Sequence, residues 1–553
     1  MKNFQFQYMW KALGIAVIPL MLGACSDRND YNDAPTDITI SANQTVWKNI
    51  QANANLSDFA ALIKKAHFDD DLQSSKFYTV WAPVNGSYDA QTLMNEDSTM
   101  VLKQFVKNHI ANYNHKISGT TSERVTTLNS KSYLFQSDGT ASTFGSIALS
   151  QMNLPSSNGM MHLLTGANPF YPNIYEYITE SNTLDSVKNY YQHFANTYLD
   201  VNNSVLGPVV NGKQTYIDSV MITTNSLFSR LNAYISREDS NYTALLPTNE
   251  AYVKAYNRIR PYFTYAAKTA AQDLSVTNLT PTITRNLNAA YFSDSLTRNA
   301  ILSHMFINNN NAYNSWVYGG DETYKDTLLT TGGTALSNGE EILSHAIQTV
   351  TMSNGKAKIL DTLAFMPGET WVPILHQDVL KSPRVLTATA TTKYADVTDV
   401  TTGKTTTLHY VDFVPSGSRA LPDVFFYLRN TLSTTYNMYV VVLPPTIDPT
   451  FEGTALPNKF SATLTYSDAN GTLKTKSLGT AFTNNPAVID TVFIGEMTFP
   501  VAYRGIGAYY PTLEIKSSVR IFNKEEMASY DREMRFNEIL LCPKELDTIK
   551  KTE

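Results

Sequence analysis

The chain of 553 residues is poor in cysteine, in charge and in long apolar runs. Its two cysteines cannot form a disulfide framework or a cysteine-only zinc site. Lysine and arginine total 43 against 49 aspartates and glutamates, so the net charge is -6 and no cationic excess exists to neutralise phosphates. This composition argues against nucleic acid as a partner.

The composition of the chain is typical of a folded protein. Hydrophobic residues make up 43% of the chain and charged residues 17%, whereas disordered chains combine low hydrophobicity with high net charge. The 33 tyrosines and 25 phenylalanines suit sheets and interfaces. Since a domain takes roughly 100 to 200 residues, the length predicts three or four units.

Residues 1–24 have the order of a signal peptide. Lys2 and Lys11 precede an uncharged stretch at 12–24, which Pro19 interrupts. This stretch is shorter than the roughly 20 residues that a membrane-spanning helix needs. We therefore expect a cleaved leader and no permanent anchor helix.

The end of the leader resembles the lipobox of bacterial lipoproteins, because Leu22, Gly23 and Ala24 stand directly before Cys25. The resemblance implies that Cys25 is lipidated and attaches the chain to the outer membrane. Residues 25–44 are polar and predict a flexible tether. Their acidic residues resemble the surface-export signal of Bacteroidota lipoproteins, which implies an extracellular location, although a solvated linker has the same composition.

Two short motifs occur twice, in the same order. Residues 78–90 and 242–256 both begin with Tyr-Thr and continue as an apolar strand. In both segments Pro-x-Asn follows the strand and supplies a turn and a helix N-cap. Residues 157–166 and 353–363 both place an Asn-Gly turn before a short apolar strand. This order predicts a tandem domain duplication.

The second copy is the longer one. Asn85 and Asn158 are 73 positions apart, whereas Asn249 and Asn354 are 105 apart, a difference of 32 residues. The segment between Tyr256 and Ser295 is the candidate insertion.

The motifs resemble those of the fasciclin domain family, whose first box is similar to 79–85 and whose last is similar to 157–162. An amphipathic helix at 56–67, a helical and tyrosine-histidine region at 101–115 and a strand at 127–136 fit the family's intervening elements. The resemblance covers about residues 45 to 375. The second copy departs from it, because Ala is missing before Pro247 and Lys358 stands where the first copy has His162.

The resemblance implies an α+β fold with two fasciclin-type domains, each a β-sandwich wedge with packed helices, at 45–172 and 173–375. It also implies adhesion or partner binding without a catalytic apparatus. The next segment, 376–545, contains alternating strand patterns such as 459–467 and predicts an all-β sandwich. Residues 546–553 predict a frayed polar tail. Tyr509 and Tyr510 are candidates for a glycan platform, although aromatics in strands more often belong to a core.

Motifs of common catalytic and metal sites are missing. The nine histidines form no HExxH pattern, and the chain has no GxSxG, Walker or GxGxxG sequence. Asp69–Asp71 favour a solvated loop over a calcium site, and Cys542 favours a core residue over a reactive thiol. We therefore predict no enzyme activity, no catalytic residue, no cofactor and no metal, and ligand-binding residues stay unassigned.

A further repeated pattern is Asp followed by Ser or Thr and then an apolar residue or Thr. It resembles the O-glycosylation tripeptide of Bacteroidota exported proteins and begins at Asp97, Asp185, Asp218, Asp294, Asp326, Asp361, Asp490 and Asp547. Chance in a chain rich in Thr and Ser explains the pattern equally well.

Three functions stay open at this point. The leading hypothesis is a non-catalytic surface lipoprotein that binds a glycan or peptide beside a TonB-dependent barrel and a SusD-like lipoprotein, as an accessory of a SusC/SusD-type nutrient-uptake complex. This link is an analogy and not an argument from chemistry. The alternative is a cell-surface adhesin acting through its fasciclin domains, and a hydrolase in the C-terminal sandwich is the third hypothesis.

Overall fold

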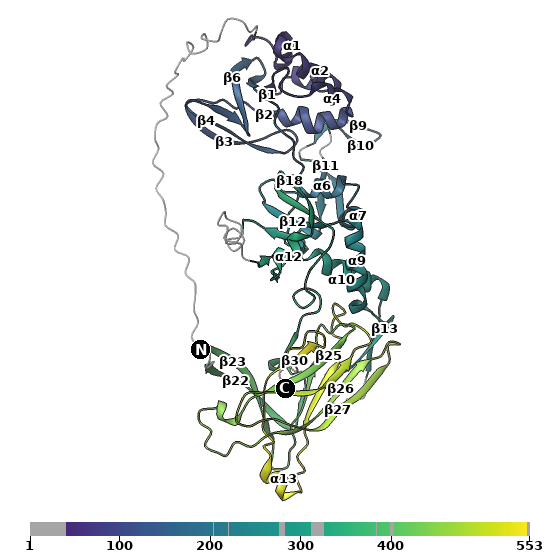
Figure 1. Ribbon diagram of the computed structural model, residues 1–553. Coiled ribbons are helices and arrows are strands. Elements are labelled where there is room, and N and C mark those ends of the chain that lie inside the picture. The colour runs from purple at the N-terminus through teal and green to yellow at the C-terminus, as the bar shows by residue number, and fades with distance from the viewer. Residues whose placement is uncertain are drawn as a thin grey trace, which may run out of the picture. The chain divides into compact units, whose positions relative to one another are not determined.

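The computed structural model describes residues 40–202, 204–218, 221–275, 282–310, 326–382, 384–398 and 403–549 (Figure 1). The predicted signal peptide, Cys25 and most of the tether lie outside these residues. The chain divides into two compact units, and the boundary falls between Phe170 and Tyr171. No helix among the described residues has both the length and the apolar character that crossing a membrane requires.

The first unit combines five short α-helices with one seven-stranded sheet of order β2-β1-β7-β6-β5-β4-β3. The helices are α1 (Val46–Ala52), α2 (Ser57–Lys65), α3 (Asp69–Gln73), α4 (Ala90–Asn95) and α5 (Ser98–Met100). The strands are β1 (Tyr78–Pro83), β2 (Ile110–Asn112), β3 (Thr120–Thr126), β4 (Ser132–Asp138), β5 (Ser142–Phe144), β6 (Ile147–Ser156) and β7 (Gly159–Leu164).

All side chains of strand β1 are buried. Because successive side chains of a strand point to opposite faces, they enter two different cores. Val80 and Ala82 pack into the core that α1 and α2 cover. Trp81 points into a second core, where its ring stacks on Phe144 with 4.0 Å between centroids. The predicted helix at 56–67 is confirmed as α2, which buries Phe59 in the first of these cores.

The first segment of the second unit repeats this arrangement in shorter form, with strand order β15-β12-β19-β18. Its helices are α6 (Ile174–Glu180), α7 (Asp185–His193), α8 (Leu227–Arg230), α9 (Asn249–Ile259), α10 (Ala289–Leu302) and α12 (Gly339–Ser344). Its sheet strands are β12 (Tyr242–Pro247), β15 (Phe306–Asn308), β18 (Ala346–Met352) and β19 (Gly355–Leu360), beside the small pair β16 (Leu328–Leu329) and β17 (Ala335–Leu336).

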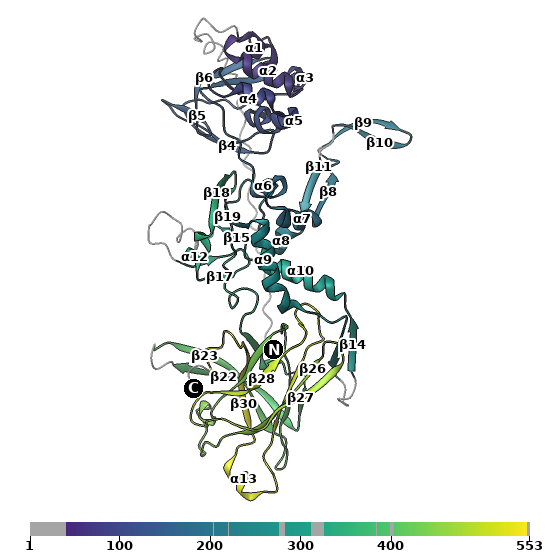
Figure 2. The same cartoon turned by 45° about the vertical axis from the view of Figure 1, so that its right-hand side comes forward.

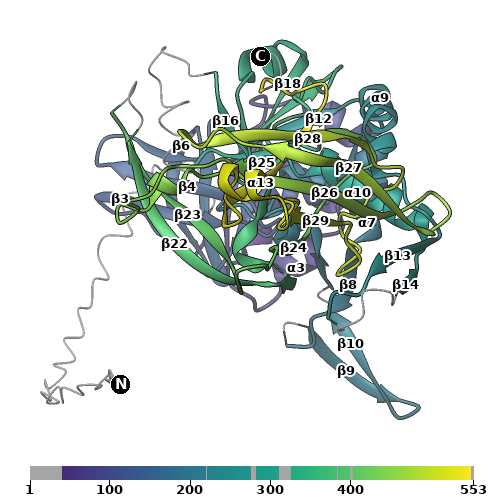
Figure 3. The same ribbon diagram turned by 90° about the horizontal axis from the view of Figure 1, so that it is seen from below.

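Two hairpin insertions distinguish this segment from the first unit. The hairpin of β13 (Lys268–Gln272) and β14 (Thr282–Asn286) falls in the predicted insertion. A second insertion lies between α7 and α8 and was not predicted, because it precedes Asn249 and does not change the spacing between the motifs. It forms a ribbon that extends from the body of its unit (Figures 2 and 3), made of β8 (Ala195–Leu199), β9 (Val205–Val210), β10 (Lys213–Asp218) and β11 (Met221–Asn225).

The remainder of the second unit contains two sheets, in agreement with a β-sandwich. One sheet has the order β22-β23-β30-β25-β28 with β20 also on β30, and the other has the order β21-β24-β29-β26-β27. The strands are β20 (Leu375–Asp378), β21 (Arg384–Leu386), β22 (Ala388–Thr398), β23 (Thr405–Pro415), β24 (Asp423–Tyr427), β25 (Thr435–Val442), β26 (Lys459–Ser467), β27 (Leu473–Thr483), β28 (Asp490–Thr498), β29 (Thr512–Ser517) and β30 (Met534–Pro543). The short helix α13 (Lys524–Ser529) lies between β29 and β30.

The β13–β14 hairpin ties the two segments of this unit together. The amide of Ala270 donates to the Ser467 hydroxyl at 3.3 Å, and the Thr512 hydroxyl donates to the Gln272 side chain at 2.9 Å. Gly471 allows a close approach, since a Cβ there would lie 2.2 Å from the Lys268 carbonyl oxygen. One hydrophobic cluster runs through both segments.

Two expectations from the sequence are corrected. Asp69–Asp71 begin α3 and do not form a loop. The predicted tail is not frayed at its start, because Asp547 is buried and its carboxylate accepts hydrogen bonds from Asn437 and Tyr439. The prediction for Cys542 is confirmed: the residue is buried in β30, and burial raises the pKa of its thiol to about 11.

Candidate functional site

The Gly of each Asn-Gly motif lets two parallel strands approach. Gly159 pairs with Tyr78 in the first unit, and Gly355 pairs with Tyr242 in the second. A Cβ on Gly159 would lie 2.0 Å from the Tyr78 carbonyl oxygen, and a Cβ on Gly355 would lie 1.9 Å from that of Tyr242. Any other residue would push the strands apart.

The Asn of each motif joins chain segments that are distant in sequence. The Asn158 side chain accepts from the Val46 amide at 2.8 Å and donates to the carbonyls of Leu72 and Ser74 at 3.0 and 2.7 Å. Asn354 repeats the pattern, with the amide of Ile174 at 2.9 Å and the carbonyls of Ile235 and Arg237 at 2.8 and 3.1 Å. These motif residues are structural and are not available to a ligand.

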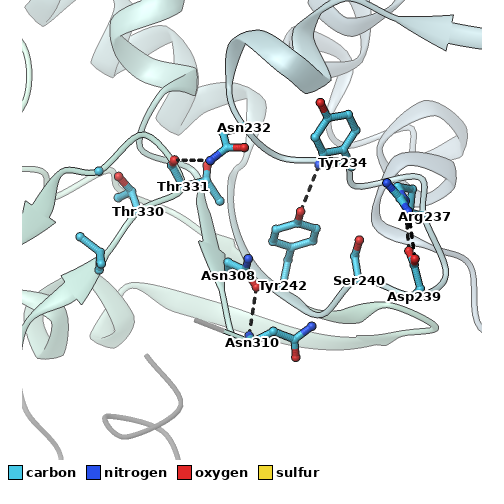
Figure 4. Close-up of a pocket in the computed structure, with 12 residues that line it drawn as sticks. Asn232, Tyr234, Arg237, Asp239, Ser240, Tyr242, Asn308, Asn310, Thr330 and Thr331 are labelled. Carbon is cyan, nitrogen blue, oxygen red and sulfur yellow. Dashed lines mark hydrogen bonds and ion pairs between the residues drawn. The ribbon is translucent and has the colours of Figure 1, made fainter. Parts of the chain in front are cut away.

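A polar cavity of about 400 Å³ opens next to the Asn354 junction, at the start of β12 (Figure 4). Amides, hydroxyls and one ion pair supply most of its lining. The polar and aromatic lining residues are Asn232, Tyr234, Arg237, Asp239, Ser240, Tyr242, Asn308, Asn310, Thr330 and Thr331. The sequence motif supplied only Tyr242, because Asn308 ends the short strand β15 and the other polar lining residues come from loops that have no recognisable pattern.

The charges of this cavity balance. The Arg237 guanidinium donates to both carboxylate oxygens of Asp239, at 3.1 and 3.0 Å, and these bonds raise the pKa of Arg237. The same guanidinium lies 5.9 Å from the centre of the Tyr234 ring, which is 39% exposed. The Tyr242 hydroxyl accepts a hydrogen bond from the Tyr234 amide at 3.1 Å.

This lining suits reversible binding of a polar ligand. An exposed tyrosine supplies a flat apolar face, and the surrounding amides and hydroxyls supply donors and acceptors. None of the lining residues is a histidine or cysteine, and Asp239 is held by Arg237. The described lining residues therefore include no histidine or cysteine that could form a nucleophile and base pair.

The first unit has aromatic residues at the edge of its sheet that corresponds to the cavity edge of the second unit. The Tyr113 amide donates to the Phe77 carbonyl, as the Asn309 amide donates to the Asn241 carbonyl in the second copy. The side chains of Phe77 and Tyr113 are 52% and 76% exposed. The two copies therefore present different chemistry at the same edge of the sheet, aromatic in one and amide-rich in the other.

The structure separates Tyr509 and Tyr510, the two tyrosines that were candidates for a glycan platform or for a core. Tyr509 packs against the hydrophobic core. Tyr510 is half-buried and lies 5.7 Å from the Tyr427 ring, with the Arg429 guanidinium 5.0 Å above it. Only Tyr510 belongs to a surface aromatic cluster, and its neighbours come from β24 and the loop after it.

Two carboxylate clusters lie in the sandwich. Burial and the neighbouring charge of Asp423 raise the pKa of Glu514 to about 7, and burial and a hydrogen bond with Asp412 do the same for Glu533. Asp423 and Glu514 are neighbours on the paired strands β24 and β29, where Asp423 lies opposite Lys516. Lys516 also neutralises Asp423 at 2.9 Å.

The histidines of the first unit serve the fold. His162 stacks on Trp81 and bonds the His115 carbonyl at 3.0 Å, and His109 bonds the Phe105 carbonyl at 2.8 Å. Within the described ranges, no three His, Cys, Asp or Glu side chains are placed to hold a metal ion. Of the hydroxyls in the glycosylation-like tripeptides, Thr362 and Thr548 are exposed, and Ser219 lies outside the described residues.

The comparisons with known proteins agree with the first-unit motifs. A family model, described as Fasciclin domain, matches residues 54–166. These residues are a fasciclin domain. Fasciclin domains are often involved in adhesion or binding and are generally non-catalytic. No curated protein sequence matches the chain.

Two solved structures show weak likeness. One is a FAS1 domain pair from the insect cell adhesion molecule fasciclin I, with 13% identity over 57% of this chain and 98% of that chain and a TM-score of 0.20. The other is a xylan-binding domain from CBM 22, with 14% identity over 31% of this chain and 93% of that chain and a TM-score of 0.16. The TM-scores are too low for either likeness to support a conclusion about this chain.

Proposed function

We propose that this chain is a non-catalytic binding protein, held on the outer face of the outer membrane by lipid on Cys25. The polar cavity beside Tyr242 carries the proposal, because its balanced ion pair and its amide and hydroxyl lining suit binding better than catalysis. The fasciclin domain at 54–166 supports it. The lipobox-like residues before Cys25 supply the attachment.

Fatty-acid labelling tests the attachment. Cells that express the chain are grown with an alkyne fatty acid, and intact cells are then treated with protease. We expect label on the wild-type chain and on Cys542→Ala, and none on Cys25→Ala. Protease should digest the wild-type chain on intact cells. Unlabelled wild-type chain would contradict the lipid anchor, and a protease-resistant chain would contradict the surface location.

We further propose that the protein is an accessory of a SusC/SusD-type nutrient-uptake complex and passes a glycan or peptide to it. Non-catalytic modules on a surface lipoprotein suit capture of a ligand for a neighbouring TonB-dependent barrel. Purification from detergent-solubilised outer membrane should recover the barrel and a SusD-like lipoprotein together with the chain. Recovery of the chain alone would reject this role.

Adhesion is the second candidate, and the exposed pair Phe77 and Tyr113 favours it, because exposed aromatics are enriched at protein interfaces. The double variant Phe77→Ser/Tyr113→Ser should then reduce cell adherence. Tyr198→Ser is the matched control, since Tyr198 is an exposed aromatic of the inserted ribbon. Unchanged adherence of the double variant, with impaired growth on a polymer, would favour ligand capture.

A further inference from the structure

A second cavity, of about 270 Å³, lies within the second unit where a loop of the sandwich meets the helices before it. Its lining combines residues that are far apart in sequence. They are Arg230, Leu231, Phe263, Leu296, Asn299, Ala300, Ser303, His304, Gly332, Thr334, Thr370 and Arg504. We propose that this cavity binds a carboxylate-bearing sugar residue, a uronic acid.

Charge is the first argument. Arg230 and Arg504 both line the cavity, and its lining includes no acidic residue from the described part of the chain. Neither guanidinium forms an ion pair with any residue of the described ranges. This differs from the cavity beside Tyr242, where Asp239 neutralises Arg237. Two uncompensated guanidiniums at one cavity favour an oxyanion, and a carboxylate matches their fork of donors.

The position of Arg504 is built into the fold. The Tyr265 hydroxyl donates to the Arg504 carbonyl at 2.7 Å, and the Ala502 amide donates to the Thr264 carbonyl at 2.7 Å. Arg285 donates to the Ile506 carbonyl at 2.7 Å. These bonds fix the backbone on both sides of Arg504, which reduces the entropy cost of holding a ligand.

A buried polar group without a partner also lines the cavity. His304 is 6% exposed, and its ring nitrogen Nδ1 is buried with no hydrogen-bond partner among the described residues. Burial, with a smaller contribution from Arg504, lowers the pKa of His304 to about 4, so its neutral ring offers one donor and one acceptor. A buried polar group without a partner is costly, and a ligand hydroxyl would satisfy it.

The remaining lining favours a sugar over a simple anion. Asn299, Ser303, Thr334 and Thr370 add amide and hydroxyl groups, whereas Phe263 and Leu296 add an apolar surface. A sugar ring presents hydroxyls at its edge and C–H groups on its faces, so it can use both kinds of surface. The volume lies slightly below the roughly 300 to 1,000 Å³ of drug-sized sites, which suits a single sugar unit.

This inference rests on the proposed binding function, since it names the ligand class of a capture protein. Isothermal titration of the full chain in detergent with D-glucuronic acid, D-glucose and N-acetylglutamate tests it. We expect glucuronic acid to bind at least tenfold more tightly than glucose, because glucose lacks the carboxylate. It should also bind more tightly than N-acetylglutamate, which lacks the ring hydroxyls.

Variants locate the site. Arg504→Gln and Arg230→Gln should each weaken glucuronic acid binding about tenfold or more, whereas Arg419→Gln, an arginine that packs on Phe522 outside the cavity, should leave it unchanged. Arg230 is exposed and its guanidinium packs on Phe194, so its replacement is compatible with folding, which thermal melting checks.

Several results would overturn the inference. If glucose binds as tightly as glucuronic acid, the guanidiniums do not recognise a carboxylate. If N-acetylglutamate binds more tightly than glucuronic acid, the ligand is a peptide carboxylate instead. If Arg419→Gln weakens glucuronic acid binding as much as the two cavity variants do, the ligand binds outside this cavity. If no uronic acid binds while Cys25 labelling and partner recovery persist, the ligand assignment fails and the proposed function stands.

Discussion

Replacement of Asn158 by Ala should destabilise the first unit and leave the second unchanged. The buried Asn158 side chain makes three hydrogen bonds, with the Val46 amide and with the carbonyls of Leu72 and Ser74. Alanine removes all three and fills none of the space. We expect loss of net hydrogen-bond energy and, in addition, the penalty for backbone groups that stay buried without partners.

The magnitude follows from these contacts. Three net hydrogen bonds are worth about 1 kcal/mol each, and the two partners that stay fully buried, the Val46 amide and the Leu72 carbonyl, each add at least about 1 kcal/mol, so the variant should lose about 5 kcal/mol. For a unit of this size, 1 kcal/mol corresponds to roughly 3 to 5 °C in the midpoint of unfolding. The first unit should therefore melt roughly 15 to 25 °C lower.

Differential scanning calorimetry of the full chain measures the effect. The two compact units should give two transitions, of which Asn158→Ala lowers one and Asn354→Ala the other, because Asn354 makes the equivalent bonds in the second unit. Asn43→Ala is the control, since that side chain is exposed. A shift of both transitions by Asn158→Ala, or a shift below 1 °C, would refute the structural role of the Asn.

Three further predictions concern burial. Burial lowers the pKa of both His109 and His162 to about 4, so the unfolded chain binds protons at a higher pH than the folded chain does. The first unit should therefore lose about 3 kcal/mol per histidine as the pH falls from about 6.5 to 4, of which calorimetry at pH 7.5 and pH 5 should detect about 2 kcal/mol per histidine. A midpoint independent of pH would contradict this prediction. The Cys542 thiol should react with a thiol reagent at pH 8 only after unfolding in guanidinium, and rapid reaction of the native chain would show that β30 is not a core strand. Asp547→Ala should lower the stability of the second unit by about 2 to 3 kcal/mol in chemical denaturation, since it removes the acceptor of the buried Tyr439 hydroxyl, whereas a frayed tail would show no change.

The elements that the sequence predicted are those whose signal is local. The alternation of apolar residues at 459–467 became β26 at the same bounds, because one face of that strand is buried and the other is not. The Asn-Gly motifs marked the starts of β7 and β19, since the turn conformation depends on the residues themselves. The inserted ribbon between α7 and α8 was missed, because it has no counterpart with which to compare it.

The sequence alone determined the composition limits, the order of the repeated motifs and the local strands, because each depends on neighbouring residues. The tertiary structure decided which side chains meet. Arg504 and His304 are 200 positions apart and share one cavity only because Tyr265 and Arg285 fix the loop that carries Arg504. Asp547 is buried only because Tyr439 and Asn437 of β25 donate hydrogen bonds to its carboxylate. Contacts of this kind depend on how the folded segments pack, and no local pattern encodes them.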